Sequence, residues 1–355
     1  MMKIKRLFAV YGLFITLSVS AQDYFNHMDL GVNVSSTGIG ADIAMPVGNY
    51  VRLRTGFTYM PKFNFNSSFG IDFMGDISDD KLRRMKDVMH DFSGQTIRDK
   101  VDLKMKPTWC SFKFLVDVFP IPNNKHWNIT AGFYAGPARI GEAVNDESAI
   151  SMLAAVNMYN NIYAKACLGE YLYNVEFEDG TIHHGDIPLA SEFVRTGMMG
   201  MPLGRFADGD RAMMVPSENC MAKAEMEVSK FRPYVGIGYN TNLSKDGKWK
   251  MALDAGVLFW GGKPKVYVDN VYKVKSIEED DQYYYYNTKW LPKDENGDFC
   301  FDGDGNLISI DAPTQRIDLI RDVTGIPGKV GDMVDTVKKF KCWPVLSFTV
   351  SYKLF

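Results

Sequence analysis

The sequence predicts an all-β protein: a closed antiparallel up-and-down transmembrane β-barrel of about eight strands, with long, partly helical extracellular loops. Three observations predict this fold. Short segments alternate apolar with polar residues, the connections between these segments alternate between short and long, and the chain starts with a cleavable export signal. Alternation with a period of two places one set of side chains on each face of a strand.

The export signal occupies residues 1–21. Three basic residues precede an apolar core at residues 7–17, and small residues lead to Ala21, before the expected cleavage at Gln22. The core is too short to cross a bilayer of roughly 30 Å as a helix, and no later run of about eighteen apolar residues follows. We therefore expect residues 22–355 to form the mature barrel, exported to the cell outer membrane.

The last predicted strand shows the alternation most clearly. Leu346, Phe348 and Val350 lie on one face, and Ser347 and Thr349 lie on the other. The eight predicted strands are 30–35, 39–45, 51–59, 112–118, 127–134, 234–239, 249–259 and 346–354.

The connections between the predicted strands are short at one end of the barrel and mostly long at the other. Links 46–49, 121–126 and 242–248 are short and rich in turn-forming residues, as tight turns require. The connections on the opposite side are long, at about 61–100, 141–231 and 272–342, except for the tight link 36–38. Short turns on the side of both termini and long loops on the other side are typical of outer-membrane barrels.

The inward faces of these strands collect charged side chains. An eight-stranded barrel has room inside only for its own side chains, so these charges are expected to pair in a structural plug. A narrow solute path is the alternative, and catalysis by the carboxylates is the least favoured interpretation. The predicted lumen charge network is Asp42, Arg52, Arg54, Lys113, Asp117, Lys250, Asp254 and Lys353.

Four aromatic residues lie beside the predicted short turns or at the C-terminus on that side: Tyr50, Trp127, Trp249 and Phe355. Such barrels carry aromatic girdles where the strands leave the hydrocarbon region. We expect these side chains to form the girdle at the membrane interface.

The ending, from Trp343 to Phe355, resembles small outer-membrane barrel proteins of the Bacteroidetes, as do the stretches 36–40 and 231–239. The terminal aromatic is similar to the signal that the barrel-insertion machinery reads, although Lys353 stands where that signal has an apolar or aromatic residue. The resemblance covers the strands and leaves the loops out. It implies an outer-membrane β-barrel located in the outer membrane, with lipid and the insertion machinery as partners.

The long loops hold the remaining candidate features. Apolar spacing predicts a helix within 146–172 and a second within 81–92. A cluster of four tyrosines at 283–286 could contact glycans or protein, although a locally packed loop is favoured. A disulfide between Cys167 and Cys220 is possible, but five cysteines leave at least one thiol over.

Metal sites are weakly supported by the sequence. The acidic stretches 294–298 and 302–306 look calcium-like, but Leu307 and Pro313 occupy positions where the helix-loop-helix calcium pattern needs Gly and Glu. Hairpin turns are the better interpretation. His183 and His184 are adjacent, which makes one metal shared by both awkward. We therefore expect no metal and no cofactor.

Three functions remain open. A non-enzymatic barrel with a structural or surface-binding role, presenting its loops to an unknown extracellular ligand, is favoured because no catalytic motif is present. The alternatives are a narrow channel or transport component and, with least support, an enzyme acting at the barrel rim. A net charge of -3 with dispersed basic residues argues against nucleic acid.

Overall fold

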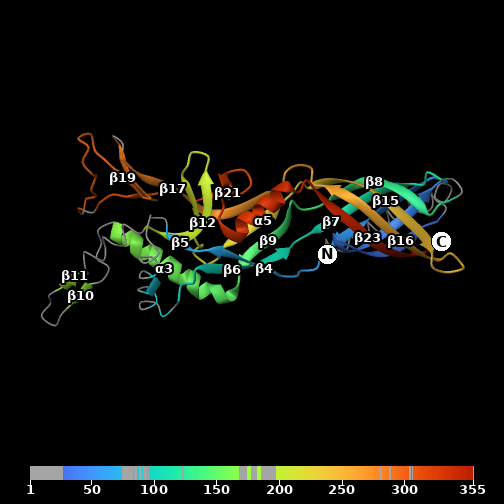
Figure 1. Ribbon diagram of the computed structural model, residues 1–355, viewed down its shortest axis with the longest axis horizontal. Helices are drawn as coiled ribbons and strands as arrows, with labels where there is room; N and C mark the ends of the chain where they lie inside the picture. Colours follow the sequence, from blue (N-terminus) through green and yellow to red (C-terminus); the bar gives the residue numbers. More distant parts are fainter. Residues whose placement is uncertain are drawn as a thin grey trace, which may run out of the picture.

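The computed structural model describes residues 27–73, 83, 86–87, 90, 94, 96–121, 124–167, 174–176, 182–184, 197–279, 282–287, 289–303, 305 and 307–354. The export signal, most of the predicted helix at 81–92 and Phe355 lie outside these residues. In Figure 1 a barrel forms one end of the molecule, and the long connections gather at the other end.

Eight strands close into a barrel in chain order, with the last strand paired to the first. All neighbours are antiparallel. The predicted closed up-and-down barrel of eight strands is confirmed, and each predicted strand is one of them. The barrel strands are β1 (Asp29–Ser35), β2 (Gly38–Val47), β3 (Val51–Tyr59), β7 (Cys110–Val118), β8 (Trp127–Ala135), β15 (Phe231–Asn242), β16 (Trp249–Phe259) and β23 (Cys342–Lys353).

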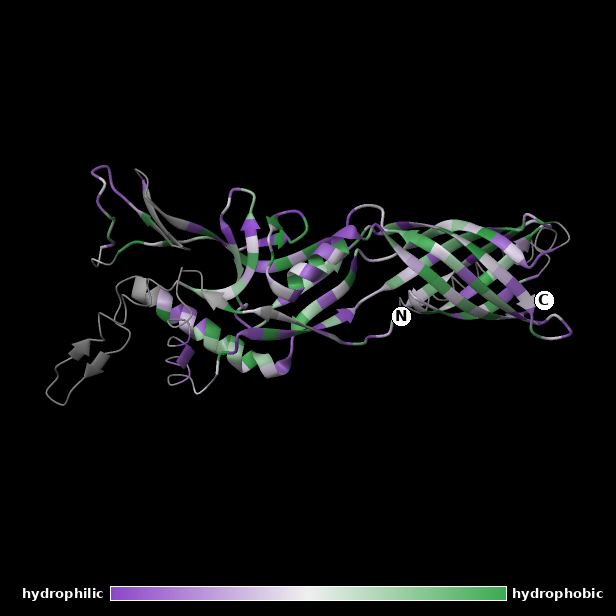
Figure 2. Ribbon diagram, viewed as in Figure 1, coloured by the Kyte–Doolittle hydropathy of each residue, from purple (hydrophilic) through white to green (hydrophobic). Residues whose placement is uncertain are grey.

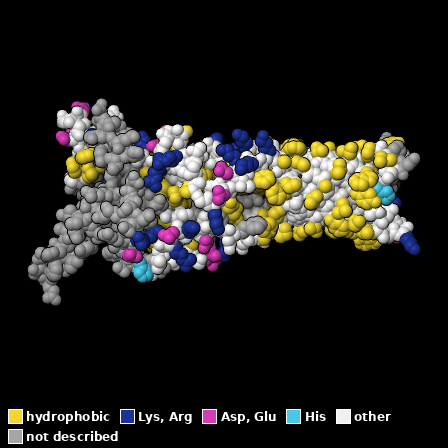
Figure 3. Space-filling view, in the orientation of Figure 1, with side chains coloured by type: hydrophobic (Ala, Val, Ile, Leu, Met, Phe, Trp, Pro, Cys, Tyr) yellow, Lys and Arg dark blue, Asp and Glu magenta, His cyan; other side chains and the backbone are white. Residues whose placement is uncertain are grey.

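The outer face of the barrel is apolar. Side chains that the alternation assigns to this face, such as Val32, Ile237 and Leu346, are more than half exposed. Their inward neighbours Asn33, Gly238 and Val345 are buried. Figure 2 shows hydrophobic residues repeating along the barrel strands, and Figure 3 shows hydrophobic side chains covering the face of the barrel in view. This is the surface a barrel needs where it faces hydrocarbon.

Both ends of the described chain lie at the short-turn end. The amide of Leu354 donates to the carbonyl of Met28, and the amide of Lys353 donates to the carbonyl of Lys248 in the turn before β16. The long connections all leave from the opposite end, as the sequence predicts.

The long connections fold together into a second unit, which we call the loop domain: the described residues of 60–109, 136–230 and 260–341. Its main sheet has the order β20-β19-β18-β17-β14-β9-β6-β4. The strands of this domain are β4 (Phe65–Gly70), β5 (Asp72–Phe73), β6 (Lys100–Pro107), β9 (Arg139–Asn145), β10 (Asn174–Glu176), β11 (Ile182–His184), β12 (Met199–Phe206), β13 (Arg211–Met214), β14 (Lys223–Glu227), β17 (Lys265–Glu279), β18 (Tyr283–Asn287), β19 (Lys289–Pro292), β20 (Ile310–Asp311), β21 (Gln315–Asp318) and β22 (Val323–Thr324).

The helices of the loop domain are a short 3-10 turn (Glu147–Ala149), α3 (Ile150–Cys167) and α5 (Gly328–Lys339). The position of α3 confirms the helix predicted within 146–172. Among the described residues, neither helix is long and apolar enough to cross a membrane.

The loop domain has its own hydrophobic core. Leu153 and Tyr159 of α3 are fully buried against Leu103 of β6 and Met199 of β12, and Val334 of α5 belongs to the same cluster. Tyr159 donates from its hydroxyl to the carbonyl of Gly197 at 3.0 Å, so this buried polar group is satisfied. The sequence predicted loops of mixed structure here, and the structure shows a packed domain.

Candidate functional site

The centre of the barrel lumen is filled by a three-membered ion network. Arg54 donates from Nη2 to Asp117 Oδ1 at 2.8 Å and from Nη1 to Asp254 Oδ2 at 2.8 Å. Arg54 is 5% exposed and Asp117 is fully buried. Thr130 adds a hydroxyl donor to Asp117 at 2.7 Å. Each of these buried charges therefore lies within hydrogen-bond distance of an opposite charge, which lowers the cost of burying it in a low-dielectric interior.

A second buried pair lies beside this network. Lys113 Nζ is 2.8 Å from Asp42 Oδ1, and the amide of Asn33 donates to Asp42 Oδ2 at 2.9 Å. Arg52, which is less buried, donates from Nε to Asp117 at 2.7 Å. These side chains come from β1, β2, β3 and β7, which are adjacent strands.

The short-turn end of the lumen holds another pair. Lys250 donates to both carboxylate oxygens of Asp29, at 3.0 and 2.9 Å, and Lys353 lies opposite Asp29 in the register of β23 and β1. The sequence reasoning missed Asp29, although it precedes inward Gly31 by two positions. The structure thus places seven of the eight predicted lumen charges in ion pairs. The eighth, Lys353, lies beside the pair of Asp29 and Lys250.

Glycine leaves space for this network. A Cβ on Gly238 of β15 would lie 2.6 Å from Asn128 Oδ1 and 2.6 Å from Asp254 Oδ1. A larger residue would require Asn128 and Asp254 to shift. The Gly-rich stretch of β15 therefore gives room to the charges of the neighbouring strand.

Aromatic side chains close the end of the lumen that faces the loop domain. The rings of Trp109 and Trp343 are 5.9 Å apart, and Trp260 stacks on Trp343 at 6.4 Å. The guanidinium of Arg232 lies 5.2 Å from the ring of Trp109 and donates to Ser111 Oγ at 2.9 Å. Together with the ion network, this cluster packs the lumen from its centre to the end that faces the loop domain.

The opposite end of the lumen is open as a vestibule of about 430 Å³. Its lining includes His27, Arg52, Lys125, His126 and Lys250. Beyond it, toward the centre of the barrel, the free space beside Arg54 and Asp42 shrinks to about 30 Å³, room for about one water molecule.

Three of the four predicted interface aromatics lie on the outer surface. Tyr50, Trp127 and Trp249 are each about half exposed at the short-turn end, and Phe355 lies outside the described residues. Trp127 contacts Tyr239, and Trp249 contacts Tyr352, with ring centroids 5.1 Å apart in both pairs.

A second aromatic band, which the sequence analysis did not single out, lies at the other end of the barrel on β3, β7, β8 and β15. Phe57 packs against Phe112 at 5.4 Å, and Phe133 packs against Phe231 at 4.9 Å. Tyr59 is half exposed at the same end of β3. Two bands at opposite ends of an apolar surface match the girdles of a membrane barrel.

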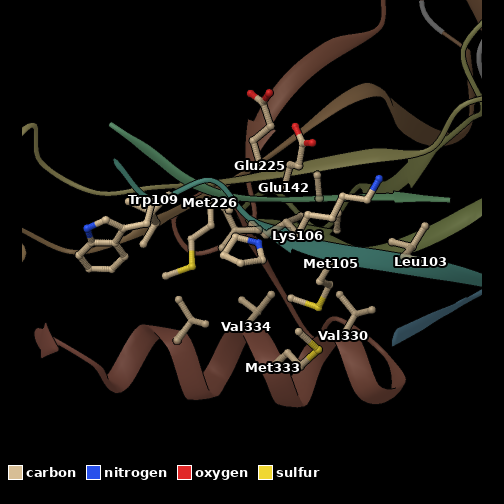
Figure 4. A pocket seen from close by; sticks show the side chains of 18 of the residues that line it. Leu103, Met105, Lys106, Trp109, Glu142, Glu225, Met226, Val330, Met333 and Val334 are labelled. Atoms are coloured by element: carbon tan, nitrogen blue, oxygen red, sulfur yellow. The ribbon is translucent and has the colours of Figure 1, made fainter. Parts of the chain in front are cut away.

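An apolar cavity of about 330 Å³ lies in the loop domain, between α5 and the sheet (Figure 4). Met105, Met226 and Met333 point into this space, whereas Glu142 and Glu225 point away from it on the other face of the sheet. We call this cavity the apolar slot. It is lined by Met60, Phe63, Leu103, Met105, Lys106, Pro107, Trp109, Ile140, Gly141, Glu142, Ala143, Ala224, Glu225, Met226, Trp260, Val266, Leu319, Val330, Met333, Val334, Val337 and Trp343.

A cluster of ion pairs on the charged face of the same sheet has Glu225 at its centre. Glu225 contacts Lys223 and Arg139 at 2.7 Å each, and Arg316 at 2.9 Å. The hydrogen bond from Lys223, followed by that from Arg139, lowers the pKa of Glu225 to about 2 despite its partial burial. Glu225 therefore stays ionised at neutral pH, and its ion pairs join β14 to β9 and β21.

The other sequence candidates do not assemble into a site among the described residues. No group of three or more His, Cys, Asp or Glu side chains in that part of the chain could hold a metal ion. The acidic stretch 294–298 forms a turn in which the Gly297 amide donates to the Asp294 carbonyl, as the hairpin interpretation predicts. His183 and His184 pair with β10 in a short hairpin, but their side chains lie outside the described residues.

The cysteines form no bridge that the structure describes. Cys110, Cys220, Cys300 and Cys342 carry free thiols. The Cys167–Cys220 disulfide that the sequence left open is therefore not formed.

Comparison with known proteins gives distant structural likenesses. No protein-family model matches the chain, and no curated protein does. The crystal structure of CarO from Acinetobacter baumannii is 12% identical, with a TM-score of 0.33, over 92% of this chain and 96% of that one. CarO2 from the same organism is 12% identical, with a TM-score of 0.34, over 92% and 98%. Likenesses this distant carry no information about the role of the chain.

Proposed function

We propose that this chain is a non-enzymatic outer-membrane protein whose barrel anchors a folded extracellular domain that binds a partner at the cell surface. One observation carries the proposal: paired charges and aromatic side chains fill the lumen from its centre to the end that faces the loop domain, while the long connections build a separate packed domain. Such a barrel would anchor the protein in the membrane and present the loop domain at the cell surface.

The membrane location is supported by the apolar outer surface and its two aromatic bands. The extracellular orientation of the loop domain follows from the rule that long loops of such barrels lie outside and short turns lie in the periplasm. We further propose that residues 1–21 direct export and that the insertion machinery recognises the final strand, β23. The likeness of the ending to Bacteroidetes barrels stays a prediction.

A narrow channel is the second candidate, and the charged vestibule at the short-turn end favours it. To conduct, such a channel would have to separate Arg54 from Asp117 and Asp254, which lie directly in the path. Arg54 and Asp254 would then lose their partners at a cost of several kcal/mol, and Asp117 would keep only Arg52. We therefore favour the closed anchor.

A planar lipid bilayer distinguishes the two functions. We expect the purified protein to give no conductance above that of the lipid alone, because the ion network and the tryptophan cluster fill the lumen. Stepwise conductance whose ion selectivity changes in Asp117→Asn would overturn the anchor and establish the channel. The Ser347→Ala variant, at a half-buried position of β23 that is in no ion pair, serves as the control.

A further inference from the structure

The apolar slot has the form of a site for a hydrocarbon chain. Its lining follows α5 from Val330 to Val337, about 10 Å of helix, and continues beyond the helix to Trp343 and Trp260. Figure 4 shows Val330 and Val334 of α5 and Met105 and Met226 of the sheet pointing into one space between the helix and the sheet. The slot is thus long in one direction, as an extended chain requires.

The interior of the slot is mainly apolar. Valine and methionine side chains line it along α5, and the nearby carboxylates of Glu142 and Glu225 point away from it. At its barrel end the lining includes Trp109, Trp260 and Trp343, whose buried indole Nε1 atoms have no hydrogen-bond partner among the described residues. Apolar cavities of about 150 Å³ already stay dry and bind apolar molecules. Methionines add an adaptable surface that accommodates flexible ligands.

The slot begins at the level where the barrel leaves the membrane. Met60 lines the slot and directly follows Tyr59 of the second aromatic band. Phe63, also in the lining, is 44% exposed and lies at the edge of the slot. The position of the slot at the surface of the outer leaflet rests on the proposed function, whereas the existence of the slot does not depend on it.

Lysines surround the barrel end of the slot. Lys338 and Lys339 form the last turn of α5, directly after the lining residue Val337, and Lys341 precedes Trp343. Lys230 and Lys263 belong to neighbouring segments of chain, since the amide of Trp260 donates to the carbonyl of Lys341 and the amide of Ser229 donates to the carbonyl of Trp260. All five are exposed. In Figure 3 basic side chains gather between the barrel and the rest of the molecule.

We propose that the apolar slot binds the hydrocarbon chain of a single-chain anionic amphiphile, with the anionic head among these lysines. The tail replaces empty apolar space, and the head meets positive charge at the surface of the outer leaflet. The amphiphile comes either from the membrane or from outside the cell, and both sources share this chemistry.

Tryptophan fluorescence tests the proposal, since Trp109, Trp260 and Trp343 all line the slot. The full mature chain is placed in nanodiscs of zwitterionic lipid and titrated with terminally brominated dodecanoate, whose bromine quenches nearby indoles. We expect saturable quenching. Val334→Phe, which fills the slot, should weaken the apparent affinity about tenfold or more. Thr336→Phe places the same side chain on the exposed face of α5 and should bind as the parent does.

The head group is tested separately. Replacing Lys338 and Lys339 together by glutamine should weaken binding of the brominated acid but leave binding of its uncharged methyl ester unchanged. If Val334→Phe does not fold, Met226→Phe fills the slot from the sheet. Equal, non-saturable quenching in the parent and the filled variants would mean partition into the bilayer only, and would overturn the proposal.

Mass spectrometry of the organic extract from the purified protein identifies the source. A co-purifying anionic amphiphile that is lost in Val334→Phe points to the membrane, whereas an empty site that takes up the added acid points to a free ligand, and both support the slot. Conductance is recorded on the same preparation. A conducting barrel that still shows saturable quenching would contradict the anchor function and leave the slot intact.

Discussion

Replacing Arg54 by alanine should destabilise the folded barrel by about 3–5 kcal/mol, as removal of one partner from a buried ion pair does. The guanidinium of Arg54 contacts Asp117 and Asp254 at once, and Asp254 has no other cation within salt-bridge distance among the described residues. Without Arg54, a nearly buried carboxylate must stay unpaired or take up a proton. The measurement is the urea midpoint at which the folded band disappears from an unheated gel.

Arg52→Ala is the matched control. Arg52 contacts only Asp117 of the same network, its side chain is 13% exposed, and Asp117 keeps Arg54 when Arg52 is removed. We expect a much smaller shift of the urea midpoint. An effect of Arg54→Ala no larger than that of Arg52→Ala would contradict the role of Arg54 at the centre of the plug.

Leu153→Ala should unfold or loosen the loop domain while the barrel stays folded. Leu153 is fully buried in the core beneath α3, and removal of such a side chain costs about 2–5 kcal/mol. Because the barrel shares none of this core, its gel mobility should not change. Limited proteolysis should cut the variant within the loop domain much faster than it cuts the parent.

Ser151→Ala, at an exposed position of the same helix, should be cut at the parental rate. Loss of the heat-modifiable band in Leu153→Ala would contradict the independence of the two units. It would mean that the loop domain is required for the barrel to close.

The barrel was predictable because its constraints are local. A strand between lipid and a packed lumen must alternate apolar and polar side chains. The two faces of β16 and β23 can therefore be recognised in the sequence. The alternation also places Arg54, Asp117 and Asp254 inside, but it does not give their partners. Arg54 and Asp254 are 200 residues apart, and their contact depends on the shear of the closed barrel.

The loop domain was less predictable for the same physical reason. Its strands pair over long sequence distances, as β14 does with β9, and both faces of its sheet are partly covered, so no clear period appears. The spacing of Val330, Val334 and Val337 is helical and was a usable signal for α5. The apolar slot depends on how α5 packs against β6, which a single sequence does not specify.

Membrane fractionation followed by a heat-modifiability gel tests the central claim most directly. The account predicts that the processed chain is found with the outer membrane, needs detergent for extraction, and migrates as a compact band that shifts only after boiling. A chain that remains freely soluble without detergent, with one band before and after heating, would contradict the membrane barrel and the extracellular position of the loop domain.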